Sequence, residues 1–251
     1  MIDIHSHLLP GVDDGAPTPE VSVAVLRRFA AQGVRVVVCT PHLNATEAPR
    51  VDHDAYAAAF ARLAQRAPTA PTLERGWEIM LDAPGCDLSA PELRLGRSRA
   101  VLVEFPRTRL PVRGGEELAR LRALGLVPVV AHPERYVGCT ADYVREWRAA
   151  GAAIQTDATM LLGSGPMTRL ARRLLEEGLV DCLASDNHGD VRTLATARRW
   201  LTDIGAAHQA ELLTATNPAR LLADEPVVPV PPVHLGRGVV GRLRELLRGG
   251  P

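Results

Sequence analysis

The amino-acid sequence predicts an α/β protein in which parallel strands alternate with helices and close into a barrel. Short apolar runs alternate with amphipathic helical stretches along the chain, which is typical of successive βα units. About seven such units in about 220 residues favour a barrel over an open sheet. Polar side chains follow the apolar runs, where a barrel would gather them at one mouth. An open doubly wound sheet is the alternative arrangement.

The expected strands are short apolar runs, at Ile2–Ile4, Val34–Cys39, Leu73–Ile79, Ala100–Glu104, Val127–Ala131, Ala153–Thr156 and Cys182–Ser185. The expected helices are Pro19–Gln32, Asp54–Arg66, Gly115–Leu124, Ala141–Ala150, Gly165–Glu177 and Val191–Ile204. We expect residues 1–224 to form one domain. Residues 225–251 are expected to be a tail, with a Pro-rich extended linker over Glu225–Pro232 and a short basic amphipathic helix over Val239–Arg248.

Composition and charge exclude several classes of protein. The chain has 251 residues and a formal net charge of zero, which argues against a nucleic-acid partner held by positive charge. All 29 basic residues are Arg, so no Lys is available for Schiff-base chemistry. The four cysteines form no Cys-x-x-Cys pair, and neither a disulfide framework nor thiol-based catalysis is expected. The sequence has no signal-peptide pattern and no membrane-spanning apolar run, so a cytoplasmic protein is expected rather than an integral membrane protein.

Candidate metal ligands open the chain. His5 and His7 lie at the end of the first expected strand, and both imidazoles face the same side because side chains alternate along a strand. Taken alone, this His-x-His pattern is a weak signal, since two ordinary strand histidines would look the same. The next loop contains Asp13, Asp14 and Gly15, and on its own it predicts an Asx turn with the glycine at positive φ.

Further imidazoles and carboxylates fall at or near the ends of later strands, at His42, Glu78, Glu104, His132, Asp186 and His188. In a βα barrel the C-terminal strand ends face one mouth, so side chains far apart in sequence can meet there. A buried carboxylate is costly unless it is paired or bound to metal, so a paired structural role is the alternative for Glu78 and Glu104. Mixed imidazole and carboxylate ligands suit Mn, Fe or Zn, and their number predicts two or three divalent ions.

A series of short motifs follows along the chain: HSH (5–7), DDG (13–15), TPH (40–42), an isolated Glu78, EFP (104–106), HPER (132–135) and SDNH (185–188). In this order they resemble the PHP (polymerase and histidinol phosphatase) superfamily. They resemble more closely its bacterial branch of capsular-polysaccharide-type (CpsB/CapC/YwqE-like) protein-tyrosine phosphatases. The resemblance extends from residue 1 to residue 224, including Asn217–Leu222, and does not cover the tail.

This resemblance implies a distorted TIM-like (β/α)7 barrel with three metal ions, often manganese. It also implies which residues would hold each ion: His5, His7, Glu78 and Asp186 the first; Glu78, Glu104 and His132 the second, with Glu78 bridging; and Asp14, His42 and His188 the third. The loop could present Asp13 in place of Asp14.

Two arginines complete the site that the resemblance implies. Arg135 matches the substrate-binding arginine of the family, and a guanidinium group suits phosphate oxygens. Arg192 resembles a second phosphate-contacting arginine, although this match requires a one-residue gap. A surface arginine paired with a carboxylate is the alternative for both. Glu134 is a candidate for holding Arg135 in place.

The implied activity is hydrolysis of phosphotyrosine on protein by in-line attack of a metal-bound hydroxide. The implied partner is a bacterial tyrosine kinase that regulates capsular or exopolysaccharide synthesis. A small-molecule phosphatase of the histidinol-phosphate type, or another PHP phosphoesterase, is the alternative enzyme. A metal-stabilised regulatory binding protein is the non-enzymatic alternative, and a homo-oligomer is left open.

Overall fold

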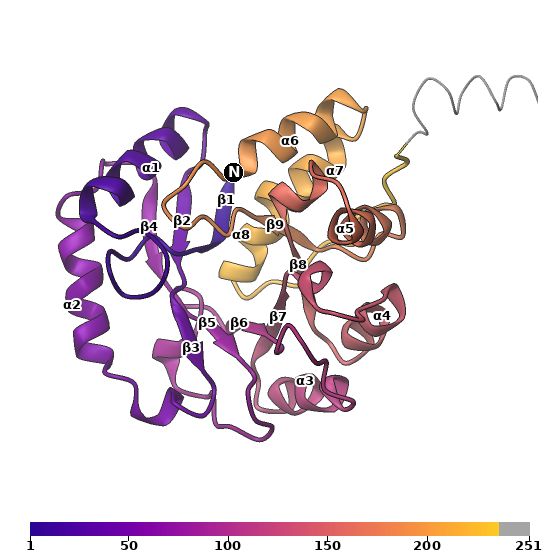
Figure 1. Ribbon diagram of the computed structural model, residues 1–251, viewed down its shortest axis with the longest axis horizontal. Coiled ribbons are helices and arrows are strands. Elements are labelled where there is room, and N and C mark those ends of the chain that lie inside the picture. The colour runs from indigo at the N-terminus through magenta and orange to yellow at the C-terminus, as the bar shows by residue number, and fades with distance from the viewer. Residues whose placement is uncertain (236–251) are drawn as a thin grey trace, which may run out of the picture.

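The computed structural model describes residues 1–235 and shows an α/β fold in which all paired strands are parallel (Figure 1). One sheet has the strand order β1-β2-β4, and the other has the order β3-β5-β6-β7-β8-β9. The strands are β1 Ile2–Ser6, β2 Val36–Cys39, β3 His42–Asn44, β4 Thr72–Arg75, β5 Glu78–Met80, β6 Ala100–Glu104, β7 Val127–Ala131, β8 Ala153–Asp157 and β9 Cys182–Ala184.

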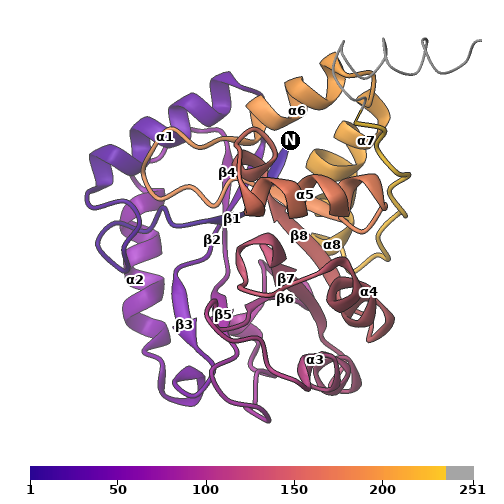
Figure 2. The ribbon, with the colours of Figure 1, turned by 45° about the vertical axis from the view of Figure 1, so that its right-hand side comes forward.

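Helices surround these strands (Figures 1 and 2). They are α1 Pro19–Ala31, α2 His53–Ala64, α3 Gly114–Ala123, α4 Ala141–Ala149, α5 Pro166–Glu176, α6 Leu194–Asp203, α7 Ala207–Glu211 and α8 Asn217–Leu222. The connection from β5 to β6 contains only a short 3-10 turn, Pro91–Leu93. The expected alternation of parallel strands and helices is confirmed, and each of the six helices predicted within residues 1–224 is present with slightly different ends.

Two strands differ from the prediction. One is interrupted where the sequence predicted a continuous strand, and the other continues beyond its predicted end. The single strand expected over Leu73–Ile79 is wrong, because β4 and β5 are separated at Gly76 and Trp77. The Tyr56 hydroxyl fills this break, lying 2.9 Å from the Gly76 carbonyl oxygen and 3.1 Å from that of Cys39. The second strand resumes after Thr40 and Pro41 as β3, which the sequence analysis missed. Pro41 has no N–H to donate to a strand ladder, which explains an interruption there.

The two faces of β6 pack against different surroundings. Val101 and Val103 belong to the large apolar cluster that includes Leu118 and Leu121 of α3. Ala100 and Leu102 belong to a second cluster, with Val129 and Ala131 of β7. Because side chains alternate along a strand, Glu104 continues the face of Ala100 and Leu102 and points away from α3. This alternation directs the carboxylate toward the enclosed side of the sheet.

The first part of the expected tail packs on the domain. Val230 and Val233 are buried, and the Val233 N–H donates to the Leu175 carbonyl oxygen at 3.0 Å. Glu225–Pro232 contains no helix or strand, as expected for a Pro-rich segment, whereas Val239–Arg248 lies outside the described residues. No helix within residues 1–235 is long and apolar enough to cross a membrane.

The loop after β1 folds back tightly over His7. A Cβ atom on Gly15 would lie 2.1 Å from the His7 carbonyl oxygen and 2.5 Å from the His7 Cβ. The same carbonyl oxygen accepts a hydrogen bond from the Ala16 N–H at 2.9 Å. Gly15 is not among the glycines with positive φ, so the expectation of a positive φ there is wrong. The loop requires glycine because of this close approach.

Replacing Gly15 with Ala should lower the free energy of unfolding by about 1–3 kcal/mol, because the new methyl group would overlap the His7 backbone. Urea unfolding followed by tryptophan fluorescence measures the change. Gly163→Ala is the matched control, since the nearest atom to its Cβ is the rotatable Thr168 hydroxyl at 3.0 Å. A Gly15→Ala protein as stable as the wild type would contradict the close packing of this loop.

Candidate metal centre

The nine candidate metal ligands lie together and form four overlapping groups. Within each group, one ligand atom from every residue lies within 4.8 Å of the others. The groups are His5, His7 and Asp186; His5, Glu78 and His132; His42, Glu78 and Glu104; and His7, Asp14, His42 and His188. Side chains from β1, β3, β5 and β6 therefore converge with those that follow β7 and β9.

His5 and His7 form the deeply buried part of the centre. Their Nε2 atoms lie 3.1 Å apart. The other ring nitrogen of each histidine contacts a side-chain oxygen outside the cluster. His5 Nδ1 lies 3.0 Å from Gln155 Oε1, and His7 Nδ1 lies 2.6 Å from Asp13 Oδ2. A metal-binding imidazole commonly donates its second N–H to such an oxygen, which fixes the ring orientation. Both Nε2 atoms are thereby aimed at the centre.

Glu78 lies at the middle of the cluster. Its Oε2 is 3.3 Å from the Nε2 atoms of both His5 and His7, and 2.9 Å from His42 Nδ1. Its Oε1 is 2.6 Å from His132 Nε2. Asp186 Oδ1 faces the same pair of imidazoles, at 3.3 Å from His5 Nε2 and 3.2 Å from His7 Nε2.

The two aspartates of the loop after β1 have different surroundings. The Asp13 carboxylate contacts His7 Nδ1 and accepts a hydrogen bond from the His42 N–H at 3.2 Å. Asp14 Oδ1 lies 3.4 Å from His42 Nε2 and 3.5 Å from His188 Nε2. Asp14 therefore lies with the imidazole ligands, whereas Asp13 lies behind His7.

Both candidate phosphate-binding arginines border the cluster at Asp186. Arg135 Nη2 pairs with Asp157 Oδ2 and lies 2.6 Å from Asp186 Oδ2. Arg192 Nη1 lies 3.4 Å from the same Asp186 oxygen, and Arg192 Nε lies 2.7 Å from Asp190 Oδ2. The two guanidinium groups thus approach one carboxylate from different loops.

Asp157 is a buried site residue that the sequence analysis missed. Its Oδ1 accepts hydrogen bonds from the Thr159 N–H at 2.7 Å and from the Thr159 hydroxyl at 2.8 Å, while Oδ2 pairs with Arg135. Glu134 Oε1 instead accepts the Asp157 N–H at 2.8 Å, so the direct partner of Arg135 is Asp157 rather than Glu134. The expected strand ended one residue before Asp157. A carboxylate at the end of a strand was the sequence pattern that could have identified this residue.

Burial and the charges of neighbouring groups both shift the pKa values of the cluster residues. Burial alone would lower the pKa of His5, but the charges of Glu78 and Asp186 outweigh it and raise this pKa to about 9. Burial, together with the charge of Glu78, raises the pKa of Glu104 to about 7. Burial would also raise the pKa of Asp186, but His5, His7 and Arg135 outweigh it and hold this pKa far below its usual range. The buried carboxylates therefore depend on nearby positive charge.

The donor set fits divalent metal ions. Among the nine candidate ligands, three buried carboxylate oxygens have no hydrogen-bond partner within residues 1–235, and they are Glu78 Oε2, Glu104 Oε2 and Asp186 Oδ1. Two ligand atoms about 2.1 Å from one ion, at an angle of about 90–110°, lie about 3.0–3.4 Å apart. The separation of the His5 and His7 Nε2 atoms, 3.1 Å, falls within this range, as do their 3.2–3.3 Å distances to Asp186. Imidazole mixed with carboxylate suits first-row transition metals.

Two of the ligands have an unusual backbone conformation. His132 has a φ of 31° and Asp186 a φ of 47°, and each directly follows or nearly follows a strand. A non-glycine residue in the left-handed region costs about 1–3 kcal/mol and persists only where the surroundings require it. Both residues with this left-handed backbone have their side chains in the cluster.

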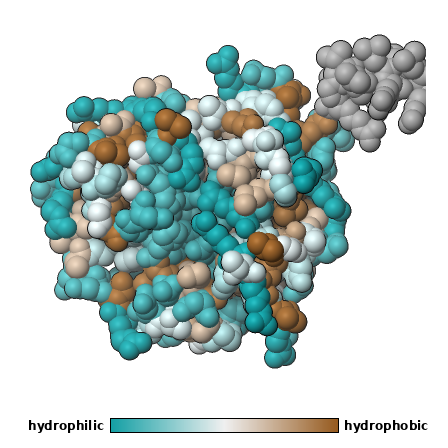
Figure 3. Space-filling model, in the orientation of Figure 1, coloured by the Kyte–Doolittle hydropathy of each residue, from teal (hydrophilic) through white to brown (hydrophobic). Residues whose placement is uncertain are grey.

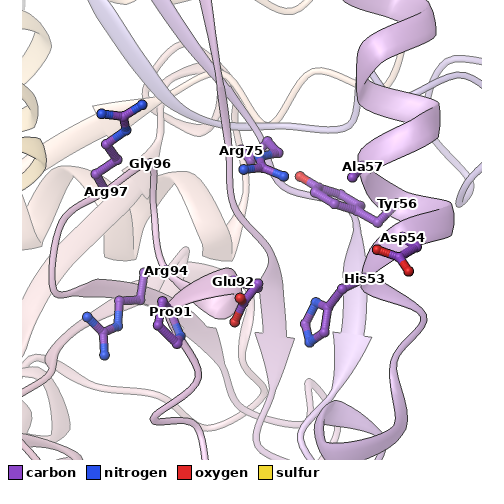
Figure 4. Close-up of a pocket in the computed structure, with 10 residues that line it drawn as sticks. All are labelled: His53, Asp54, Tyr56, Ala57, Arg75, Pro91, Glu92, Arg94, Gly96 and Arg97. Carbon is purple, nitrogen blue, oxygen red and sulfur yellow. The ribbon is translucent and has the colours of Figure 1, made fainter.

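A cavity of about 430 Å³ lies away from these ligands, between α2 and residues 91–97 (Figure 4). Arg75 and His53 line it on one side, and Arg94 and Arg97 extend from the opposite segment. Within residues 1–235, none of its lining residues belongs to a group with metal-ligand spacing. This cavity is therefore separate from the metal centre.

Comparisons with known proteins agree with this centre. Residues 1–223 match the family model for capsular polysaccharide synthesis, CpsB/CapC. Tyrosine-protein phosphatase YwqE of Bacillus subtilis is 31% identical over 197 residues, covering 75% of this chain and 77% of YwqE. Tyrosine-protein phosphatase CpsB of Streptococcus pneumoniae is 29% identical over 241 residues, covering 90% of this chain and 99% of CpsB.

Solved structures show the same relationship. A structure from work on YwqE of B. subtilis and CpsB of S. pneumoniae, described there as unique metal-dependent tyrosine phosphatases, has a TM-score of 0.78 at 27% identity. The match covers 94% of this chain and all of that one. A phosphotriesterase homology protein from Escherichia coli, with a TM-score of 0.53 at 13% identity over 88% of this chain and 98% of that one, shares the fold alone. The chain belongs to the CpsB/CapC family.

Proposed function

We propose that this chain is a metal-dependent protein-tyrosine phosphatase that hydrolyses phosphotyrosine on a protein substrate. The observation that carries the proposal is the buried cluster of imidazoles and carboxylates, with Arg135 and Arg192 beside it. The names of the relatives support the choice of substrate, because YwqE and CpsB are tyrosine-protein phosphatases. The family description supports a target within capsular polysaccharide synthesis, and a bacterial tyrosine kinase is the protein we propose.

We propose that the cluster holds two or three divalent ions, with manganese as the first choice and iron or zinc as alternatives. Glu78 would bridge two of them, because its two oxygens face different sets of imidazoles. Asp14, His42 and His188 would hold an ion at the more exposed end, where Asp14 has a side chain 73% exposed. When bound, such ions lower the pKa of a water molecule and neutralise charge on phosphoryl oxygens.

Arg135 would bind and orient the phosphoryl group. Its guanidinium is held by Asp157 and Asp186, and its buried Nε has no hydrogen-bond partner. A guanidinium fixed in this way can donate to phosphate oxygens with little reorganisation. Arg192, which contacts Asp186 from a different loop, would add a second donor.

Thiol-based catalysis does not suit this chain, although Cys139 and Arg145 have the Cys-x5-Arg spacing of cysteine phosphatases. Arg145 lies within α4 and pairs with Asp142 and Glu177, so it does not close a phosphate-binding loop around Cys139. Burial raises the pKa of the Cys139 thiol to about 12, which disfavours the nucleophilic thiolate.

We also infer that the strands close into a distorted TIM-like (β/α)7 barrel, formed by residues 1–224 and followed by the 225–251 tail. β2 and β3 would be two halves of one strand, as would β4 and β5, because each pair is separated only by a short break. The gap between β9 and β1 is bridged by Ser6 and Asn187, with the His7 N–H donating to the Asn187 carbonyl oxygen at 2.8 Å. These contacts support a ring of seven strands.

Removal of metal should abolish phosphatase activity, and Mn²⁺ should restore it. The same treatment should lower the thermal unfolding temperature, because the buried carboxylates would lose their compensating charge. Dialysis against a chelator, followed by activity assays, calorimetry and elemental analysis, measures both effects. Full activity in protein shown by elemental analysis to be free of metal would refute the metal-dependent reaction.

Replacing Arg135 with Ala should lower kcat/KM toward a phosphotyrosine peptide by about 10²–10³-fold, because a fixed donor to the phosphoryl oxygens is lost. Thermal unfolding is measured in parallel, since Asp157 also loses its partner. Arg145→Ala is the matched control, because Arg145 pairs only with carboxylates on exposed helix surface, and its activity should stay within about twofold of the wild type. Unchanged turnover by a folded Arg135→Ala protein would rule out the proposed role.

A substrate panel tests the choice of phosphotyrosine. We expect kcat/KM to be highest for phosphotyrosine peptides and much lower for histidinol phosphate and for dinucleotides. If histidinol phosphate were hydrolysed far faster than the peptide, the small-molecule alternative would replace our proposal. If metal-loaded protein hydrolysed none of these substrates, a regulatory binding protein would be the better description.

A further inference from the structure

Exposed apolar side chains gather on the loops that surround the metal centre. Among the described residues, nine large apolar side chains are at least 36% exposed. Six of them lie in loops that follow strands or, for Met167, at the second position of α5: Val12, Val112, Val137, Leu162, Met167 and Val191. The three most exposed are in this set, at 90% for Val112, 84% for Val191 and 68% for Val137. We call these six residues the apolar rim.

Several rim residues are close neighbours of site residues in the chain. Val191 directly precedes Arg192, and Val137 follows Arg135 by two positions. Val12 directly precedes Asp13, which holds His7. Consecutive Cα atoms are about 3.8 Å apart, so the Cα atoms of these three valines lie within about 8 Å of those of Asp13, Arg135 or Arg192. These three rim residues therefore lie in the same segments as residues that border the candidate metal centre.

A groove of about 580 Å³ extends the rim on one side of the centre. It lies between the loop after β5 and the loop after β6, beginning at Leu81 and Phe105, just beyond the ligands Glu78 and Glu104. Val112 lines this groove, and the loop after β7 is joined to its wall, because the Val137 N–H donates to the Arg107 carbonyl oxygen at 2.8 Å. None of the nine candidate ligands lines the groove, which begins one residue after Glu104 and three residues after Glu78 along the chain.

The charges of the groove indicate what it would accept. Arg113 pairs with Glu116 at 2.8 Å and Arg120 pairs with Glu117 at 2.6 Å, so these charges are compensated. Arg109 makes no ion pair within residues 1–235. Asp82 also lines the groove and makes no ion pair within these residues, since its carboxylate accepts hydrogen bonds from Thr46. The lining charges therefore balance, and the apolar side chains of the groove suit apolar residues of a bound chain.

We propose that the apolar rim and this groove bind the polypeptide on either side of the phosphotyrosine in a protein substrate. The inference rests on the proposed phosphatase activity and adds apolar flanking residues to the recognised substrate. Scattered apolar residues are ordinary on protein surfaces, but their concentration around a catalytic centre indicates a macromolecular contact. On the face of the molecule seen in Figure 3, hydrophilic residues gather near the middle, and hydrophobic residues lie on both sides of them.

The test replaces Val112, Val137 and Val191 together by Ser, and compares a long substrate with a short one. The long substrate is a phosphotyrosine peptide with Leu on both sides of the phosphotyrosine, and the short one is free phosphotyrosine. We expect kcat/KM for the peptide to fall by at least about tenfold, mainly through KM, because several contact residues are lost at once. The value for free phosphotyrosine should stay within about twofold of the wild type, since the rim lies outside the metal centre.

The matched control is the double variant Leu124→Ser and Ile204→Ser, which makes the same kind of substitution at exposed apolar residues beside the C-terminal ends of α3 and α6. It should leave both substrates unaffected. An equal fall for both substrates in the triple variant, or no fall for the peptide, would overturn the proposal. Sedimentation that changed from oligomer to monomer, with peptide kinetics unchanged, would assign the rim to contacts between copies of the chain instead. Failure of the wild type on both substrates would refute the phosphatase itself.

Discussion

The burial of Glu78 is the constraint on which the rest of this structure depends. A carboxylate removed from water is strongly unfavourable unless positive charge or hydrogen-bond donors replace the lost solvent. Here the replacement comes from imidazoles on other elements, with His5 and His7 on one side of the carboxylate and His132 on the other. One oxygen still has no hydrogen-bond partner, which is the arrangement expected of an atom that coordinates a cation. Parallel strands suit this requirement, because their C-terminal ends bring one polar side chain from each strand to the same place.

The interruptions in two strands lie just before two of the candidate ligands. After the break at Pro41, β3 pairs with β5 so that His42 lies opposite Glu78, and Met80 then lies opposite Glu104. The break does not shift the register, because Cys39 and Arg75 before it, and His42 and Glu78 after it, are both pairs 36 positions apart. The two strands therefore resume in register, and each has a candidate ligand as its first residue after the break. Local departures from regular structure often coincide with functional sites.

The sequence was sufficient for the α/β class, the parallel strands and the gathering of the ligands. These depend on period-two alternation and on polar residues at strand ends, both of which are local patterns. It was not sufficient for the break at Gly76, because that break is filled by Tyr56 from a distant helix. It also missed Asp157, whose importance comes from its contact with Arg135 rather than from any motif. Contacts of this kind arise only when separate elements pack, so single-sequence patterns do not carry them.

The separation between the ligands and the rim has a consequence for substrate choice. Cationic groups that bind a phosphoryl oxygen do so for any phosphomonoester, so the proposed site of Arg135 and the candidate metal ligands would not by itself distinguish phosphotyrosine in a protein from a small phosphate ester. Discrimination must come from contacts with the leaving group and its flanking chain. In this fold such contacts can come only from the loops after the strands, because the strands end in ligands. Exposed Val137 and Val191, each beside a site arginine, are therefore where a change of substrate could occur without disturbing the buried cluster.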